Sequence, residues 1–280
     1  LAAIVLIGGF IALMLMRVPV SFAMLLSTLG CALVTGTNFS VLVRQMVDGV
    51  NNFSLLSIPF FILMGEIMGA GGISDKIIDL ANLAVGRFRG GLAYVNCLSS
   101  MFFGGISGSA VADVSSLGSV VIPMMKQQGY TEDFSVGLTV TTACQGVLIP
   151  PSHNMVIYAL AAGGVSIGTL FMAGLLPGIA LGCGMIIMCM LMAKRYNFPK
   201  GEGVAKGEGI KILLRGILPM MTLLIIMVGT GAGVFTATEA SAIACVYTMF
   251  LSMVVFRSVK LRDVGQILKN SLKTLAIVMT

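Results

Sequence analysis

A short Gly/Ser-rich break between two apolar arms limits the possible folds of this chain more than any other feature. The break reads Gly-Gly-Ile-Ser-Gly-Ser over residues 104–109, and the arms cover residues 91–106 and 110–125. Each arm is too short to cross a bilayer, because a spanning helix needs about 20 apolar residues. The break must also be covered by protein or water, since lipid offers its backbone N–H and C=O groups no partners. The pattern predicts a re-entrant helical hairpin whose tip is suited to hold an ion or a small polar solute.

The composition sets the class of protein. The chain is 57% hydrophobic and 10% charged, whereas soluble domains carry about 25% charged residues. We therefore expect an all-α polytopic membrane protein. The net charge of +6 is typical of cytoplasmic loops in such a chain and does not call for a nucleic-acid partner. The six cysteines lie inside apolar runs without a CxxC pair, and we interpret them as small hydrophobic residues.

Apolar runs predict the helices. They cover residues 1–16, 18–35, 53–70, 91–106, 110–125, 134–149, 152–195 and 212–256, and the last two contain turns at Gly163-Gly164 and near Thr236. Residues 74–89 alternate apolar and charged positions at helical spacing, which predicts an amphipathic helix along the membrane interface.

The basic residues indicate the orientation. If Leu1 begins outside, Arg44 is the one Lys or Arg of the seventeen that falls outside, and the other sixteen fall inside. The reverse orientation would place sixteen on the wrong face. The N-terminal end is therefore expected outside, and the hairpin is expected to enter from the cytoplasm with Arg89 and Lys126 at its feet.

A faint internal repeat accompanies this orientation. Residues 1–16, 18–34 and 41–59 can be laid over residues 222–237, 239–255 and 262–280 at one constant offset. The first copy would begin outside and the second inside. An inverted repeat of this kind is common in secondary transporters.

A second break follows the hairpin, in Pro150-Pro151-Ser152-His153-Asn154. Two prolines remove two backbone donors and interrupt the helix in the membrane. The carbonyls freed before Pro150 can coordinate a cation. The half-helix that starts at Ser152 turns its positive end towards an anion, and Ser152 itself is a suitable N-cap.

Seven segments of the chain carry a family resemblance. They are Ile58–Glu66, Gly86–Gly91, the hairpin Phe102–Ala110, Gly129-Tyr130, Ile149–Ser152, Ala173–Gly178 and Gly233–Ala240. In this order they resemble the large membrane (M) subunit of tripartite ATP-independent periplasmic (TRAP) transporters, over nearly the whole chain. Family members continue past residue 280 to a second hairpin and a further Pro-Pro break, so the chain looks truncated before that second hairpin.

The resemblance implies an elevator-type transporter of the bacterial inner membrane, with its N-terminal end periplasmic. It would import a small organic acid that a periplasmic binding protein delivers, and a small membrane (Q) subunit would brace it. Na⁺ would be the coupling ion, and no enzymatic cofactor is expected. The other partners expected are membrane lipid and the substrate, and not nucleic acid.

The resemblance also assigns residues. The sodium site would be formed by Ser107, Gly108, Ser109, Gly146, Pro150 and Ser152. The substrate would be contacted by Ser109, Ser152, His153 and Asn154, of which the last two lie where family members vary. Asp113 is either a charge just outside the ion site or an acidic residue favoured in the first turn of a helix. Glu66 is expected to reach the interface or to pair with Arg87 or Lys76, and Glu239 to cap a helix.

The expected domain organisation has five parts. They are scaffold helices with the interfacial helix (1–90), a transport core with the hairpin and the broken helix (91–175), the last helix of the first repeat (176–195), a cytoplasmic linker (196–211), and the incomplete second repeat (212–280).

Two alternatives stay open. One is a sodium/dicarboxylate symporter that needs no binding protein. The other, remote, is an intramembrane serine protease, because Gly105-Ile106-Ser107-Gly108 matches the GxSG signature of rhomboids and His153 is the sole histidine. A serine nucleophile needs such a base within hydrogen-bond reach, but an inverted repeat has no place in that fold. We therefore expect no enzyme.

Overall fold

The computed structural model describes residues 1–201 and 207–279. The chain divides into two compact units. The first comprises Leu1–Phe53 with the residues from Ile277 onward, and the second comprises Ser54–Ala276. Each unit is described by itself.

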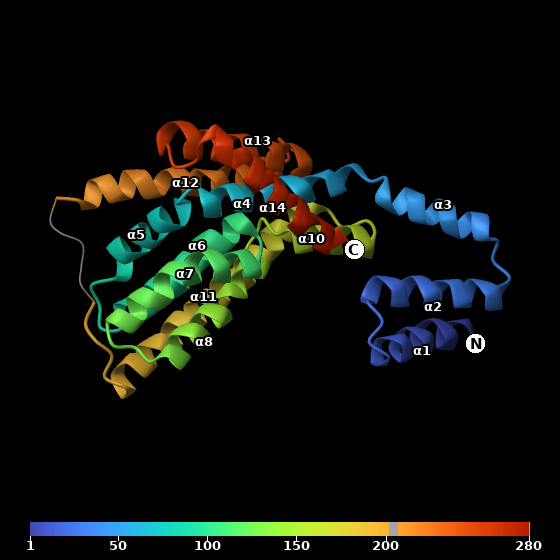
Figure 1. Cartoon of the computed structure of the whole chain (residues 1–280), viewed down its shortest axis with the longest axis horizontal. Helices are drawn as coiled ribbons and strands as arrows, with labels where there is room; N and C mark the ends of the chain where they lie inside the picture. Colours follow the sequence, from blue (N-terminus) through green and yellow to red (C-terminus); the bar gives the residue numbers. More distant parts are fainter. Residues whose placement is uncertain (202–206, 280) are drawn as a thin grey trace. The chain divides into compact units, whose positions relative to one another are not determined.

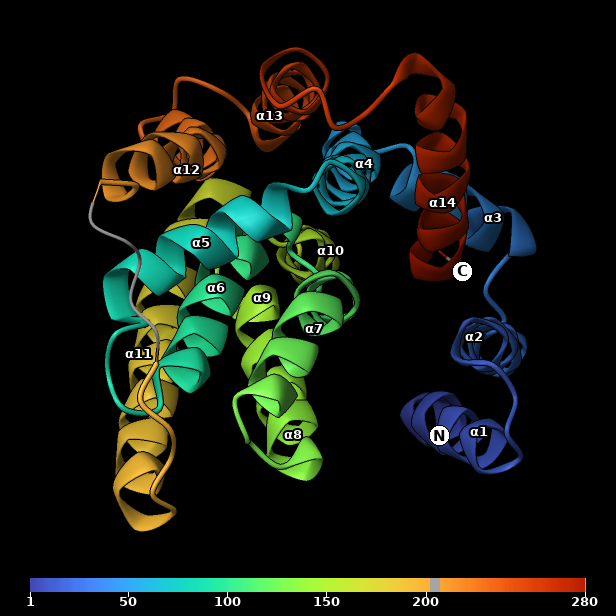
Figure 2. The same cartoon turned by 60° about the vertical axis from the view of Figure 1, so that its left-hand side comes forward.

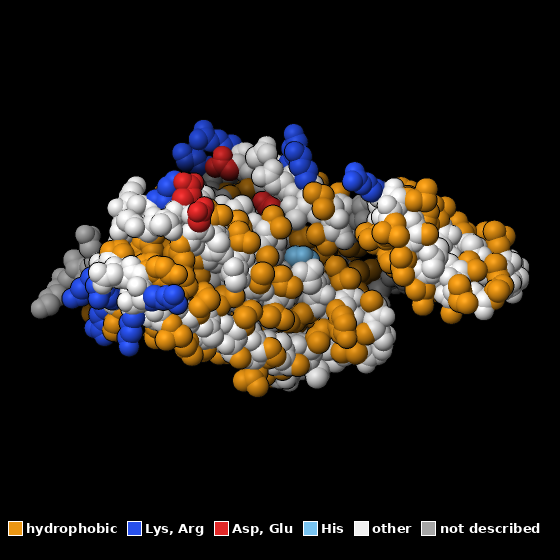
Figure 3. Space-filling view, turned by 90° about the horizontal axis from the view of Figure 1, so that it is seen from below, with side chains coloured by type: hydrophobic (Ala, Val, Ile, Leu, Met, Phe, Trp, Pro, Cys, Tyr) orange, Lys and Arg blue, Asp and Glu red, His pale blue; other side chains and the backbone are white. Residues whose placement is uncertain are grey.

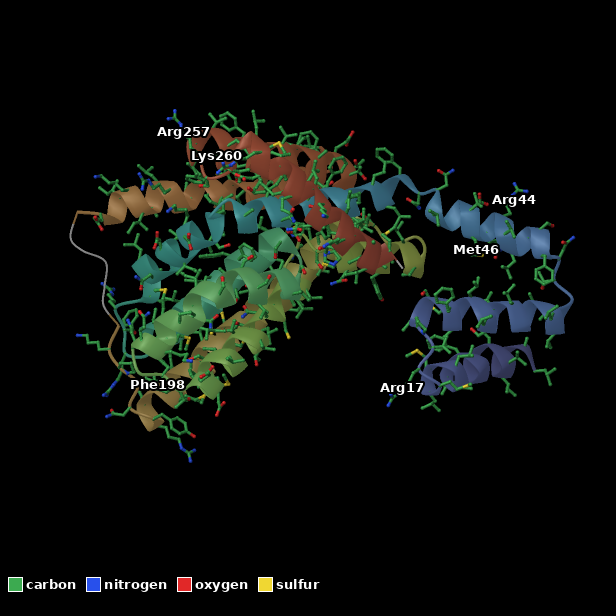
Figure 4. The ribbon with its side chains drawn as sticks, viewed as in Figure 1. Arg17, Arg44, Met46, Phe198, Arg257 and Lys260 are labelled. Atoms are coloured by element: carbon green, nitrogen blue, oxygen red, sulfur yellow. The ribbon has the colours of Figure 1, made fainter. Side chains whose placement is uncertain are left out.

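The first unit contains α1 (Ala2–Leu15), α2 (Val20–Thr35) and α3 (Phe39–Val50). Helices α1 and α2 lie side by side (Figure 1). They approach closely at Gly9, where an added Cβ would lie 3.7 Å from the Ser27 Cβ. Arg17 occupies the turn between α1 and α2, and Arg44 lies on α3 (Figure 4).

The second unit is built of helices alone in its described part. A short 3₁₀ turn, η1 (Phe53–Leu56), leads into it. Its helices are α4 (Ser57–Ala70), α5 (Ile73–Val85), α6 (Gly91–Ser107), α7 (Ala110–Gln127), α8 (Glu132–Ala143), α9 (Gln145–Leu148), α10 (His153–Ala162), α11 (Ile167–Arg195), α12 (Gly209–Gly231), α13 (Ala237–Phe250), the π turn η2 (Leu251–Val255), and α14 (Leu261–Met279). Helices α6 and α7 form a hairpin that packs with α8, α9 and α11 (Figure 2).

Four helical segments in the described residues are long and apolar enough to cross a membrane. They are Phe53–Ala70, Ile167–Arg195, Gly209–Gly231 and Ala237–Val255. Many of their apolar side chains are exposed in the structure, as lipid-facing surfaces are. The prediction of an all-α polytopic membrane protein is confirmed.

The predicted hairpin is present, but its break is shorter than expected. Helix α6 continues through Gly104 and Gly105 and ends at Ser107. The turn consists of Gly108, whose φ of +63° is left-handed, and Ser109. Ser109 begins the second arm as an N-cap, because its hydroxyl accepts a hydrogen bond from the Ala112 N–H at 3.3 Å. Two residues therefore suffice to reverse the chain.

The amphipathic helix also forms, as α5, and ends at Val85 instead of residue 89. Its apolar stripe is Ile73, Ile77, Ile78 and Ala81, all buried, and the helix packs against α6 and α12. This buried face is what the helical spacing predicts. The interfacial position of the helix stays a prediction.

The two feet of the hairpin lie at the end of the unit where α11 ends. The Phe198 ring lies 4.9 Å from the Tyr130 ring and 4.8 Å from the Phe134 ring, centroid to centroid, and Figure 4 labels Phe198 at this end. Arg89, before α6, donates from Nε to the Phe198 carbonyl at 3.1 Å. The predicted linker 196–211 thus begins against the hairpin, while residues 202–206 lie outside the described residues.

Candidate functional site

The tip of the hairpin lies directly against the Pro-Pro break. Helix α9 ends at Leu148, Ile149 is extended, and α10 begins at His153. A Cβ added to Gly108 would lie 2.6 Å from the Pro151 carbonyl oxygen and 2.9 Å from the Ser152 Cα. Because the backbone is also left-handed there, only glycine fits at the tip.

Further glycines bring the hairpin and α9 into backbone contact. A Cβ on Gly146 would lie 2.9 Å from the Gly104 Cα. A Cβ on Gly105 would lie 2.8 Å from the Ile149 Cγ2 and 3.6 Å from the Pro150 carbonyl oxygen. At Gly104 and Gly146 the two elements are therefore in backbone-to-backbone contact, and at Gly105 the Ile149 side chain packs against the hairpin.

Ser152 occupies the N-cap position of α10, as predicted, but its side chain makes no capping hydrogen bond. The hydroxyl instead donates to the Gly108 carbonyl at 3.5 Å. The expectation of a side-chain cap is wrong, because the tip of the hairpin offers the Ser152 hydroxyl an acceptor of its own.

Ser107 and Ser109 differ in burial. Ser107 is 2% exposed, and its Oγ lies 3.4 Å from the Ser109 N–H that donates to it. Ser109 is half-buried and caps α7. Gly65 of α4 covers the tip from the other side, since a Cβ there would lie 3.6 Å from the Ser107 Cα. Gly65 belongs to the Ile58–Glu66 segment, but sequence reasoning gave it no part in the site.

His153 and Asn154 are placed differently from each other. His153 is 6% exposed, its backbone nitrogen lies 3.4 Å from the position of a Gly108 Cβ, and its Nδ1 has no hydrogen-bond partner among the described residues. Asn154 is exposed. The structure therefore brings His153 to the hairpin tip and leaves Asn154 on the outside of α10.

A buried chain of polar side chains runs between the hairpin and α8, and sequence reasoning missed it. The Asn96 Nδ2 donates to the Thr139 Oγ1 at 2.8 Å, and the Thr142 Oγ1 donates to the Asn96 Oδ1 at 3.3 Å. The Ser100 Oγ lies 3.2 Å from the Thr142 Oγ1 and 3.4 Å from the Asp113 Oδ1. The sequence does carry a signal, because Asn96 and Ser100 are one helical turn apart on α6.

Asp113 closes this chain. It lies in the first turn of α7, as one of its two interpretations required. It is also 1% exposed, and its Oδ2 has no hydrogen-bond partner among the described residues. A carboxyl oxygen without a partner is costly in an apolar interior, and a role of Asp113 beside the ion site stays a prediction.

Glu66 and Glu239, the two other acidic residues that the sequence analysis singled out, have structural partners. The Glu66 Oε1 accepts a hydrogen bond from the Thr274 Oγ1 at 3.2 Å, and no ion pair with Arg87 or Lys76 is present in the described chain. Glu239 forms a capping box with Thr236 at the start of α13, as predicted.

The residues that meet at the break supply neutral oxygens. Ser107 and Ser152 contribute buried hydroxyls, and the carbonyls of Gly108, Pro150 and Pro151 lie at the contact. Hydroxyl and carbonyl oxygens suit a hard cation of low charge. The structure brings Gly108 against Ser152 and packs Gly146 against Gly104 of the same hairpin, with the Pro150 carbonyl near Gly105, while Ser107 and Ser109 flank Gly108 at the tip. Sodium binding by the six predicted ligands stays a prediction.

The comparisons with known proteins agree with this architecture. The chain matches the family described as "Tripartite ATP-independent periplasmic transporter, DctM component" over residues 7–280. A putative TRAP transporter large permease protein of Haemophilus influenzae is 37% identical, with 100% of this chain and 66% of the relative covered.

The names of two further relatives include a substrate. The sialic acid TRAP transporter large permease protein SiaM of Vibrio cholerae is 36% identical, with 97% of this chain and 64% of the relative covered. The 2,3-diketo-L-gulonate TRAP transporter large permease protein YiaN of Escherichia coli is 34% identical, with 100% of this chain and 66% of the relative covered. The chain thus spans about two thirds of the length of these relatives. It belongs to the DctM component family, the large permeases of TRAP transporters.

Proposed function

We propose that the full-length protein imports a small organic acid into the cell by sodium-coupled secondary transport. A periplasmic binding protein delivers the acid, and a small membrane subunit braces the permease in the inner membrane. The single observation that carries the proposal is the contact between the hairpin tip at Gly108 and the break at Pro151-Ser152. Two interrupted helices that meet inside a membrane protein are the arrangement in which transporters bind ions and solutes.

The coupling ion would be held by the serines and carbonyls at this contact. Na⁺ prefers oxygen ligands, and the contact offers hydroxyls and carbonyls within a backbone-to-backbone fit. Binding of Na⁺ would hold the hairpin tip against the Pro-Pro break. The substrate site would then form only when Na⁺ is bound.

The acid would bind beside the ion, at the N-terminal end of α10. The positive end of a helix favours a carboxylate, and His153 and Ser152 begin this helix. The names of two relatives state sialic acid and 2,3-diketo-L-gulonate, both of which are carboxylates. Selection among acids would rest mainly with the binding protein.

An elevator motion fits the packing. The hairpin and α9 are joined by glycine contacts at Gly104 and Gly146, so they would move as one body.

The proposed orientation places the N-terminal end in the periplasm. It rests on the distribution of basic residues along the sequence. Within the second unit, both hairpin feet and the end of α11 lie at one end.

The test is uptake by the full-length permease with its small subunit in proteoliposomes. Uptake of a labelled organic acid should require both an inward sodium gradient and the binding protein. Replacement of the sodium gradient by a potassium gradient should abolish it. Uptake that is driven equally by either ion would overturn the sodium coupling.

The same assay separates the alternatives. Sodium-driven uptake that persists without any binding protein would favour the independent sodium/dicarboxylate symporter. The protease alternative has one observation in its favour, the proximity of the His153 backbone to the Gly108 tip. Covalent labelling of Ser107 by a serine-reactive phosphonate would support it, and the relatives' names as transporter permeases argue against it.

A further inference from the structure

A groove opens at the other end of the hairpin, between the start of α6 and the last turns of α11. Its volume is about 610 Å³. It is lined by Phe88, Arg89, Tyr94, Ile187, Met190, Leu191, Ala193 and Lys194. The groove lies away from the Pro-Pro break, and nothing in the transport mechanism above uses it.

One part of the groove carries positive charges that no salt bridge neutralises in the described part of the chain. Arg89 and Lys194 line it, and Arg87 and Arg195 flank them in sequence. The sequence has no acidic residue between Asp79 and Asp113 or between Asp133 and Glu202. Among the described residues, none of these four cations forms a salt bridge. Lys and Arg gather at this end of the unit beside a broad hydrophobic surface (Figure 3).

Arg89 is held in position by the linker. Its Nε donates to the Phe198 carbonyl at 3.1 Å, and its Nη2 donates to the Asn197 Oδ1 at 2.5 Å. These bonds use two of the five N–H groups of a guanidinium. The remaining N–H groups stay available to an anion, and a fixed guanidinium binds phosphate well.

The other part of the groove is an apolar helix face. Ile187, Met190 and Leu191 are 56%, 48% and 66% exposed. They lie on α11, which is long enough to span a membrane. The exposed face follows the helix away from the cations, so a ligand that fills the groove needs both an anionic head and an apolar tail.

We propose that this groove binds an anionic phospholipid. Its phosphate would lie between Arg89 and Lys194, and an acyl chain would lie along Ile187, Met190 and Leu191. Basic pockets between membrane helices favour such headgroups. The lipid would fasten the hairpin foot, the linker and α11 to one another at the membrane surface.

The test uses the full-length permease with its small subunit, purified in mild detergent. Native mass spectrometry would measure retention of phosphatidylglycerol against phosphatidylcholine for the wild type, Lys194→Gln, and the control Lys269→Gln. Lys269 is equally a single exposed cation but lies on α14. The wild type and the control should retain phosphatidylglycerol selectively, and Lys194→Gln should bind it about fivefold more weakly.

A second measurement tests the acyl-chain contact in the groove and whether the bound phosphate belongs to a lipid or is free inorganic phosphate. Leu191→Asn should weaken retention of phosphatidylglycerol, because it removes acyl contact without a change of charge. Inorganic phosphate at millimolar concentration should not displace the lipid. Equal retention of both lipids by the wild type, equal behaviour of Lys194→Gln and Lys269→Gln, or displacement by phosphate alone would each overturn the proposal.

Discussion

At the scale of single residues, the contact between Gly104 and Gly146 decides how the site is built. Each glycine faces the other's backbone, and neither has space for a Cβ. Sequence reasoning assigned Gly146 to the ion site through the family motif, but gave Gly104 no partner. The partner could not be predicted, because a glycine in a membrane helix does not show which neighbour approaches it.

Gly146→Ala should destabilise the protein by about 1–3 kcal/mol, because the added methyl forces α6 and α9 apart. Its control is Gly137→Ala on α8, where a Cβ meets nothing within 4 Å and the helix gains propensity. Thermal unfolding of the full-length protein in detergent measures both. A Gly146→Ala protein as stable as the control would contradict the close packing of α6 and α9.

His153→Gln should change the apparent affinity for the acid, because it replaces the imidazole that begins α10 beside the hairpin tip. The measurement is uptake by the intact complex across a range of pH. Tyr158→Phe, an exposed position on the same helix, is the control and should follow the wild type. If the uptake profile of His153→Gln also matches that of the wild type, His153 contributes to helix packing alone.

At the scale of elements, the sequence predicted helices and breaks well and side-chain partners poorly. The runs 1–16, 18–35 and 91–106 became α1, α2 and α6 with small shifts, because apolar length and glycine or proline positions are local signals. The hairpin arms were read as apolar, whereas α6 buries Asn96, Ser99 and Ser100. The α8 partners of Asn96 and Ser100 lie more than forty positions along the chain, Thr139 for Asn96 and Thr142 for both, beyond the reach of local patterns.

Thr142→Val tests the polar chain between α6 and α8. The variant keeps the shape of the side chain and removes the hydroxyl that bonds Asn96 and Ser100. Stability should fall by about 1–3 kcal/mol, since buried partners are left unpaired. Thr141→Val removes a hydroxyl one position along, which is exposed and bonds only the Gly137 carbonyl within its own helix. Equal melting temperatures for the two variants would show that these buried polar side chains contribute nothing to the stability of the protein.

At the scale of the whole molecule, the family match adds what packing alone does not give. At the offset of the predicted repeat, α2 and α3 map onto residues 241–256 and 260–271, which overlap α13 with η2 and α14, whereas α1 maps onto residues 223–236 and meets only the last turns of α12. The inversion of the second copy stays a prediction. The ion, the acid and the partner subunits likewise lie outside what helices and glycines specify.

The sodium dependence of uptake by hairpin-tip variants tests the central claim most directly. Ser107→Ala and Ser109→Ala in the full-length complex should each raise the sodium concentration for half-maximal uptake, because each removes a hydroxyl oxygen from the hairpin tip. Ser115→Ala, an exposed serine on α7 whose hydroxyl bonds the Ala112 carbonyl, should leave it unchanged. A sodium dependence in both tip variants that matches the wild type would contradict the account.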